Sequence, residues 1–292
     1  MRLKNSCLVV AVALAIVLFP SRAAAQNPDT LLPEESTALA KKLIGQMIDA
    51  LGGPAFLHAR QMQCAGRLAQ FEHSGNLSGY TILRNYWQFP DKNRAEYIVK
   101  GSKLGVLSVL FGSIPIKGGT IIQVYSGNEG WTLDRGGVSA LPPDAIAQFQ
   151  EQLKRSVDHL LRYRLGEHGM SFRYGGLDLI DMLPVDWVEI TDSDERQFRL
   201  AIRRDNHLLA RSVVTSLDPT THGVTEDLTL FANYHAQDGI QTPLQVTRQR
   251  DGRRLFQIFY DSCSYDPNLP PDFFTKEALE KRSPQSDSRK DE

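Results

Sequence analysis

A long series of period-two segments, separated by short turns, most constrains what this chain can fold into. From Gln61 onward, apolar and polar residues alternate in runs that end at turns rich in Gly, Asn and Asp, with a spacing of roughly 8–12 residues between strands. The pairs Asp238-Gly239 and Asp251-Gly252 are strong hairpin signals, because both residue types tolerate a positive φ. No strand–helix–strand rhythm appears. The pattern predicts a large antiparallel meander of roughly ten strands.

A sheet of this size must twist and curve, and two amphipathic segments are available to cover it. The first apolar stripe ends at Gly52-Gly53-Pro54, a typical stop signal, and consists of Leu39, Leu43, Ile44, Met47, Ile48 and Leu51. The second begins at Pro142-Pro143-Asp144 and consists of Ile146, Phe149, Leu153, Val157, Leu160 and Leu161. We therefore expect an α+β fold, in which a curved, unclosed antiparallel half-barrel carries the helices on its concave face.

The N-terminus has the layout of a secretory signal peptide. Arg2 and Lys4 precede an apolar run from Cys7 to Phe19, and small residues follow up to Ala25. The apolar run is shorter than a membrane-spanning helix needs. Export to the periplasm or beyond the cell is the expected localisation. The expected organisation is a signal peptide over 1–25, a linker over 26–35, one domain over 36–275 and a disordered charged tail over 276–292.

The charge balance is close to neutral. The sequence has a net charge of −1, and loss of the three basic residues of the leader makes it slightly more acidic. This balance argues against a nucleic-acid partner and against a polybasic membrane patch.

Two cysteines, Cys64 and Cys263, remain after the leader, on the first and last expected strands of the domain. Export permits a disulfide between them, which would close nearly the whole domain. The alternative is a pair of separate buried thiols that pack as small hydrophobic groups.

The segment Leu104 to Gly119, LGVLSVLFGSIPIKGG, is the most apolar part of the chain after the leader. One interpretation is a buried strand or helical turn of the core. A second is a flap over a hollow, with its glycines as hinges. A third is a surface that dips into a membrane.

No catalytic or metal-binding signature appears in the sequence. The seven histidines form no HxH, HxxxH or HExxH motif, and no cysteine pair has zinc spacing. Phosphate-loop, dinucleotide-binding and GxSxG motifs are also absent. We therefore expect no metal or cofactor and no enzymatic activity, although a site assembled from distant residues would leave no local pattern.

A set of spaced positions resembles the LolA-like superfamily of periplasmic lipoprotein carriers. In the first half these positions are the helix end Ala50 to Gly53, the strand residue Gly66, and Pro90 with Arg94 in YWQFPDKNRAEY. The turn in VYSGNEGWTL follows. In the second half they are Tyr234, Asp238, Gly239 and Pro243 around one turn, and Asn268 with Phe274 near the end. The resemblance spans most of residues 38–275. It implies an unclosed half-barrel whose hollow, plugged by helices, holds acyl chains. This chain is longer in its middle region than the carriers.

The resemblance implies a non-enzymatic carrier or binder of lipids or lipoprotein acyl chains, with a membrane-associated donor or acceptor protein as a further partner. The residues expected to form the lid and cavity are Leu107, Phe111, Phe149, Leu153, Val157, Trp87 and Trp131. One alternative is an envelope sensor or interaction domain of the same fold without cargo. The other is an uncharacterised hydrolase.

Overall fold

The computed structural model describes residues 28–72, 74–109, 112–217 and 223–282, and for 99–118 it describes the backbone only. The expected signal peptide and Phe111 therefore lie outside the described residues. Thirteen strands form one antiparallel sheet in the described part of the chain. They are β1 (Gln61–Phe71), β2 (Leu77–Gln88), β3 (Lys92–Val109), β4 (Gly112–Ser126), β5 (Glu129–Asp134), β6 (Gly137–Ala140), β7 (Ser171–Ile180), β8 (Leu183–Thr191), β9 (Gln197–Arg203), β10 (Leu209–Leu217), β11 (Val224–Gln237), β12 (Ile240–Arg250) and β13 (Arg253–Tyr265).

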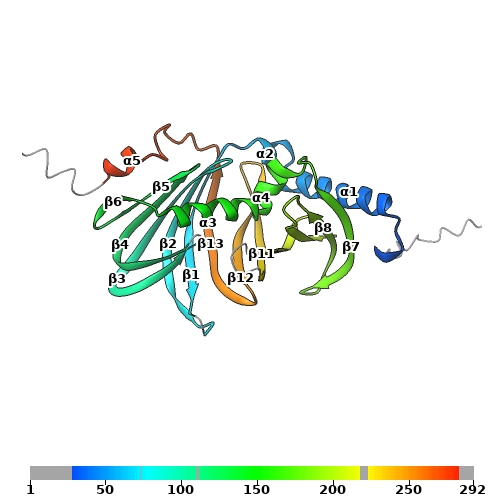
Figure 1. The fold of residues 1–292 in the computed structure, drawn as a ribbon, viewed down its shortest axis with the longest axis horizontal. Coiled ribbons are helices and arrows are strands. Elements are labelled where there is room, and N and C mark those ends of the chain that lie inside the picture. Colours follow the sequence, from blue (N-terminus) through cyan, green and yellow to red (C-terminus); the bar gives the residue numbers. More distant parts are fainter. Residues whose placement is uncertain (1–27, 73, 110–111, 218–222, 283–292) are drawn as a thin grey trace, which may run out of the picture.

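The sheet consists of two meanders joined at a seam. Its order is β6-β5-β4-β3-β2-β1-β13-β12-β11-β10-β9-β8-β7, so the first and last strands of the chain are neighbours at the centre. At this seam Cys64 pairs with Cys263, and their sulfur atoms form a disulfide. The curved sheet remains open, because its edge strands β6 and β7 lie at opposite ends (Figure 1).

A helical crossover connects the two edge strands. It comprises α3 (Pro143–Lys154), the short α4 (Val157–His159) and a π-helical segment, η2 (Leu160–Arg164). Figure 1 shows α3 running across the strands between the two halves. We call the sheet face that carries α1 and α3 the inner face, and the opposite one the outer face.

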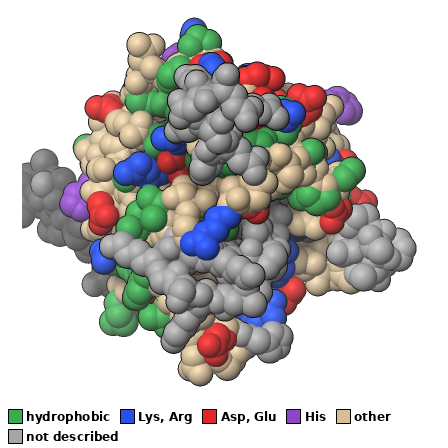
Figure 2. All heavy atoms as spheres, turned by 90° about the vertical axis from the view of Figure 1, so that its left-hand side faces the viewer, with side chains coloured by type: hydrophobic (Ala, Val, Ile, Leu, Met, Phe, Trp, Pro, Cys, Tyr) green, Lys and Arg blue, Asp and Glu red, His purple; other side chains and the backbone are tan. Residues whose placement is uncertain are grey.

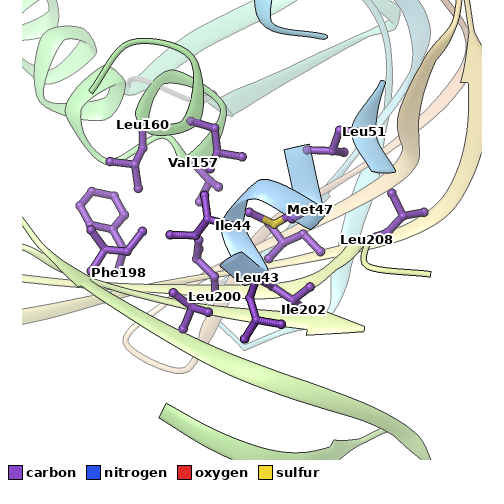
Figure 3. Close-up of a cluster of buried hydrophobic side chains, with 14 of the residues drawn as sticks. Leu43, Ile44, Met47, Leu51, Val157, Leu160, Phe198, Leu200, Ile202 and Leu208 are labelled. Carbon is purple, nitrogen blue, oxygen red and sulfur yellow. The ribbon is translucent and has the colours of Figure 1, made fainter. Parts of the chain in front are cut away.

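The main core lies between α1 (Pro33–Leu51) and the inner face of the β7–β13 half. Pro33 and two glutamates occupy the first turn of α1, where proline and acidic residues favour a helix start. The apolar stripe of α1 packs on Phe198, Leu200 and Ile202 of β9 and on residues of the crossover. Figure 3 shows these side chains pointing toward one another. Burial of each large apolar side chain contributes about 1.5–3 kcal/mol, so this contact fixes α1 firmly.

The C-terminal segment packs on the outer face of the β1–β6 half. Phe274, and Leu279 of α5 (Lys276–Glu280), are buried against Val124 and Leu133. Residues 276–280, which we expected to be disordered, are therefore a helix, because Leu279 completes an apolar cluster that local composition does not reveal.

Other differences from the sequence prediction concern short elements. The predicted count of about ten strands was too low, since β6, β7 and β8 are additional to the runs recognised in the sequence. Gly52-Gly53 ends α1 as predicted, but a short α2 (Pro54–His58) follows directly, and a 3₁₀ turn, η1 (Pro28–Thr30), precedes α1. In the part of the chain that the structure describes, no helix has the length and apolar character needed to cross a membrane.

Candidate functional site

The inner face of the β1–β6 half is the candidate site, and α3 covers one end of it. Phe149 of α3 is completely buried, and its ring stacks on Tyr125 of β4 with centroids 4.4 Å apart. Trp87 of β2 lies on the same ring at 6.2 Å. Leu153, one helical turn further along α3, joins this cluster. The cluster is separate from the main core, so α3 is held on this half by few side chains.

Strand register places three rows of side chains on this inner face. The row beneath α3 consists of Trp87, Asn93 and Tyr125, which are paired across β2, β3 and β4. The next row consists of Asn85, Ala95 and Gln123, and the third of Leu83, Tyr97 and Ile121. The face therefore changes from aromatic to polar to apolar with distance from α3.

The apolar row belongs to a buried cluster whose described members come only from strands. They are Leu68, Leu83, Ala95, Tyr97, Ile121, Phe256 and Ile258. This cluster differs from the main core, to which α1 contributes buried side chains. It spans β1 to β4 and β13, and so lies across the seam of the sheet.

The apolar segment Leu104–Gly119 forms the distal part of hairpin β3–β4. The hairpin register shifts between Val99 and Leu104, where β3 carries extra residues opposite β4. Figure 1 shows the end of this hairpin bending back toward the middle of the molecule. Residues 104–109 and 112–119 are therefore strand in their backbone. The side chain of Leu107 lies outside what is described, so burial in the core, a flap and a membrane surface all stay predictions for this segment.

Asn93 and the polar row carry neutral polar groups whose hydrogen-bonding capacity is incompletely used. The amide nitrogen of Asn93 donates to Asn85 Oδ1 at 2.8 Å and to the Tyr86 carbonyl at 3.1 Å. Asn93 Oδ1 and Gln123 Oε1 are buried, and no described residue donates a hydrogen bond to them. Burial also raises the pKa of the Tyr125 hydroxyl and that of the Tyr97 hydroxyl, so both stay protonated. A few neutral polar groups in an apolar surface are typical of a small-molecule site.

The predicted site residues fall into three places. Trp87, Phe149 and Leu153 come together beneath α3. Val157 instead packs in the main core beside α1, because the chain turns at Ser156 between α3 and α4. Trp131 packs with Val124 and Phe274 on the outer face, away from Phe149.

Asn85, Asn93 and Gln123 were not among the residues predicted to form the site. A signal for them exists in the sequence, since they occupy core-facing positions of otherwise apolar alternating runs. Their meeting, however, depends on strand register, which alternation alone does not define.

The exposed surface at this end of the molecule is mixed. Figure 2 shows described hydrophobic side chains in small groups among basic and acidic ones. A hollow of about 420 Å³ lies beside the C-terminal end of α3, but charged residues line most of it, among them Lys154, Arg164 and Glu167. The described residues contain no group of three His, Cys, Asp or Glu side chains placed to hold a metal ion. Phe149 fills the space beneath α3, so a ligand there would have to displace it.

Three solved structures illustrate what this chain is similar to. A DUF1329 family protein from Desulfovibrio piger has 13% identity and a TM-score of 0.52, over 84% of this chain and 99% of that one. A domain assigned to outer membrane lipoprotein sorting from Vibrio parahaemolyticus has 10% identity and a TM-score of 0.49, over 82% and 99%. A LolA superfamily protein from Nitrosomonas europaea has 14% identity and a TM-score of 0.43, over 82% and 99%.

The likeness to the DUF1329 protein shows a shared fold. The other two structures are named for outer membrane lipoprotein sorting and for the LolA superfamily, the class that the sequence pattern resembles. No protein-family model and no curated protein sequence matches the chain.

Proposed function

We propose that this protein binds the acyl chains of a lipid or lipoprotein on the inner face of its β1–β6 half, beneath α3, and that it does so without catalysis in the cell envelope. The observation that carries the proposal is the placement of Phe149, which occupies the aromatic end of an apolar face in a small cluster of its own. Helix α3 would then act as a lid, and Phe149 would hold the place of the ligand in the empty protein.

The energetics favour exchange of the lid for an acyl chain. Withdrawal of Phe149 and Leu153 into water costs about 5 kcal/mol, at roughly 1.5–3 kcal/mol for each side chain. Each methylene group that takes their place contributes about 0.8 kcal/mol, so about six methylenes offset the opening. A longer acyl chain therefore binds with a favourable net free energy, whereas a shorter one does not offset the cost of opening and leaves the lid closed.

The break in the crossover at Ser156 supports a motion in which α3 moves without α4 and η2. Its stripe is interrupted at Ser156, whose hydroxyl accepts a hydrogen bond from the His159 backbone and starts a new helical turn. Beyond this point Val157, Leu160 and Leu161 are fixed in the main core. Helix α3 can thus leave the inner face while the following turn stays in place, once the Glu151–Arg196 ion pair and the bond from Arg248 to Gln152 are broken.

Native mass spectrometry of residues 26–292, purified without detergent and then exposed to phospholipid vesicles, tests binding directly. A bound lipid mass is expected. A bare protein mass under both conditions contradicts the proposal and favours the alternative of a protein-docking domain without cargo.

Tryptophan fluorescence tests the position of the lipid. A variant that keeps only Trp87 (Trp131→Phe, Trp187→Phe) should change its emission when vesicles are added, because α3 leaves its ring. The matched control keeps only Trp131 (Trp87→Phe, Trp187→Phe), on the outer face, and should not respond. Equal responses of the two variants would contradict binding beneath α3.

A further inference from the structure

Three arginines surround one aspartate on the inner face, next to the end of α3. Asp227 of β11 is 4% exposed. Its carboxylate accepts from Arg250 Nε at 2.8 Å, and it lies 3.3 Å from Arg248 Nη2 and 3.5 Å from Arg155 Nη1. Among the ion pairs of the described residues, these arginines have no second carboxylate. The group therefore carries three positive charges against one negative charge.

The arginines also keep buried donors that find no acceptor in the part of the chain that the structure describes. These donors are the Nε groups of Arg248 and Arg155, which are buried and have no hydrogen-bond partner among the described residues. The Arg248 side chain is only 9% exposed, and its Nη2 is shared between Asp227 and the neutral Gln152. Ser216 Oγ is likewise buried and has no partner within residues 28–72, 74–109, 112–217 and 223–282. It lies two residues along β10 from Val214, the strand partner of Asp227.

An excess of positive charge at a buried position is costly unless an anion compensates it. Desolvation of an unpaired ion costs several kcal/mol, and a buried N–H without an acceptor adds a further penalty. Burial lowers the pKa of Arg248, and the neighbouring Arg250 and Arg155 lower it further against the opposing effect of Asp227. The Lys154 carbonyl at the end of α3 does not supply the missing negative charge, since Arg164 already donates to it at 2.7 Å.

We propose that Arg155, Arg248 and Arg250 bind one phosphate group, and that this phosphate is the headgroup of the lipid whose acyl chains lie beneath α3. The planar guanidinium fork matches phosphate oxygens, which would accept from the two unpaired Nε–H groups. The proposal rests on the proposed function, because it places headgroup and acyl chain along one helix. Phe149 and Arg155 are six residues apart, about 9 Å along a helix axis.

The solvent access of the arginine cluster and its position at the end of α3 agree with phosphate binding. The Arg250 side chain is 39% exposed and opens the cluster to solvent, whereas Arg248 forms its buried floor. Arg155 directly follows α3. A phosphate at this point would connect the end of the lid to β11 and β12, and would fix α3 in the position that it takes around its ligand.

The test compares two lipids that differ only in the phosphate: phosphatidic acid and diacylglycerol with the same acyl chains. Residues 26–292 should bind phosphatidic acid about tenfold more tightly or better, as charge-assisted hydrogen bonds predict. Arg155→Gln should remove most of this preference while diacylglycerol still binds. Arg248→Gln should do the same, and circular dichroism checks its folding. Arg67→Gln is the control, because Arg67 is exposed and pairs with Asp261.

Inorganic phosphate separates the two sources of the anion. It should raise the melting temperature of the wild type and not that of Arg155→Gln. Equal binding of both lipids, with no effect of phosphate, overturns the phosphate site and leaves lipid binding intact. Stabilisation by phosphate without binding of either lipid upholds the phosphate site but overturns its lipid source, together with the proposed function.

Discussion

Gly66 illustrates how a single residue is constrained at the seam of the sheet. The pairing of β1 with β13 shifts between Ala65 and Gly66, where β13 carries one extra residue. A Cβ atom at Gly66 would lie 2.1 Å from the Phe259 carbonyl oxygen, a distance that no rotamer change relieves because the obstacle is backbone.

Gly66→Ala is expected to lower the free energy of unfolding by about 3 kcal/mol, since the two strands must separate to admit the methyl group. Urea unfolding followed by circular dichroism measures it. Gly79→Ala in β2 is the matched control, because nothing lies within 4 Å of its added Cβ, and its stability should stay close to that of the wild type. Equal stability of the two variants would show that the seam tolerates side chains.

Other positions of the LolA-like pattern also lie at joints of the fold. A Cβ at Gly52 would lie 2.7 Å from the Gly239 carbonyl oxygen, where α1 ends against the β11–β12 turn. Arg94 forms a buried ion pair with Glu96 at 2.8 Å and donates to the Phe273 carbonyl at 3.0 Å. The Tyr234 hydroxyl donates to the Leu209 carbonyl at 2.8 Å. These roles explain why the pattern indicates the fold more strongly than any cargo.

At the scale of elements, the crossover is attached to the sheet by the carboxylate of Asp192. This side chain is fully buried and lies 2.9 Å from Arg164 Nη2 of η2 and 3.0 Å from Arg196 Nη1. Burial alone would raise the pKa of Asp192, but hydrogen bonds from Arg164 and Arg196 outweigh it and hold the pKa below its usual range.

Asp192→Asn should lower the free energy of unfolding at pH 7 by about 3 kcal/mol, because two buried guanidinium groups lose their buried carboxylate and keep only half-exposed ones, Glu167 for Arg164 and Asp194 and Glu151 for Arg196. The wild-type contribution is complete above the ordinary aspartate pKa of 3.8 and is lost as the pH falls through the lower folded-state value. The variant should therefore show a weaker loss of stability in acid, measured by urea unfolding between pH 3 and 7.

Asp194→Asn is the control for this prediction. Asp194 also pairs with Arg196, at 2.7 Å, but its side chain is 55% exposed, so its removal should cost less than about 1 kcal/mol. If the two variants were equally stable, Asp192 would not be the attachment point of the crossover.

At the scale of the whole molecule, the Cys64–Cys263 disulfide closes the seam between the two meanders. The cysteines are 199 residues apart, so the bond encloses almost the whole sheet. Chain entropy predicts that a loop of this length stabilises the fold by about 5 kcal/mol.

The double variant Cys64→Ala, Cys263→Ala should accordingly unfold at a much lower urea concentration than the oxidised wild type. Reduction of the wild type should bring its unfolding midpoint close to that of the variant. Identical midpoints for oxidised wild type, reduced wild type and variant would mean that strand pairing alone holds the seam.

Part of this architecture could be predicted from local pattern. Alternation identified most strands, and Asp238-Gly239 and Asp251-Gly252 form the turns that these pairs favour, with positive φ at all four residues. The apolar stripe of α1 could also be predicted, because the residues on one face of a helix recur every three or four positions in the sequence. The second segment could be predicted to be amphipathic. Its break at Ser156 could not be predicted, because Ser156 caps a new helical turn whose apolar residues pack on α1, which is distant in sequence.

What the sequence by itself determined is the alternation that makes an open antiparallel sheet and the two apolar stripes that cover it. Only the tertiary structure decided which residues meet: Phe149 with Trp87 and Tyr125, Trp131 on the opposite face, and three arginines around Asp227. The physical reason is that periodicity specifies a face of each strand, whereas strand order and register, fixed by packing across the whole sheet, specify its neighbours.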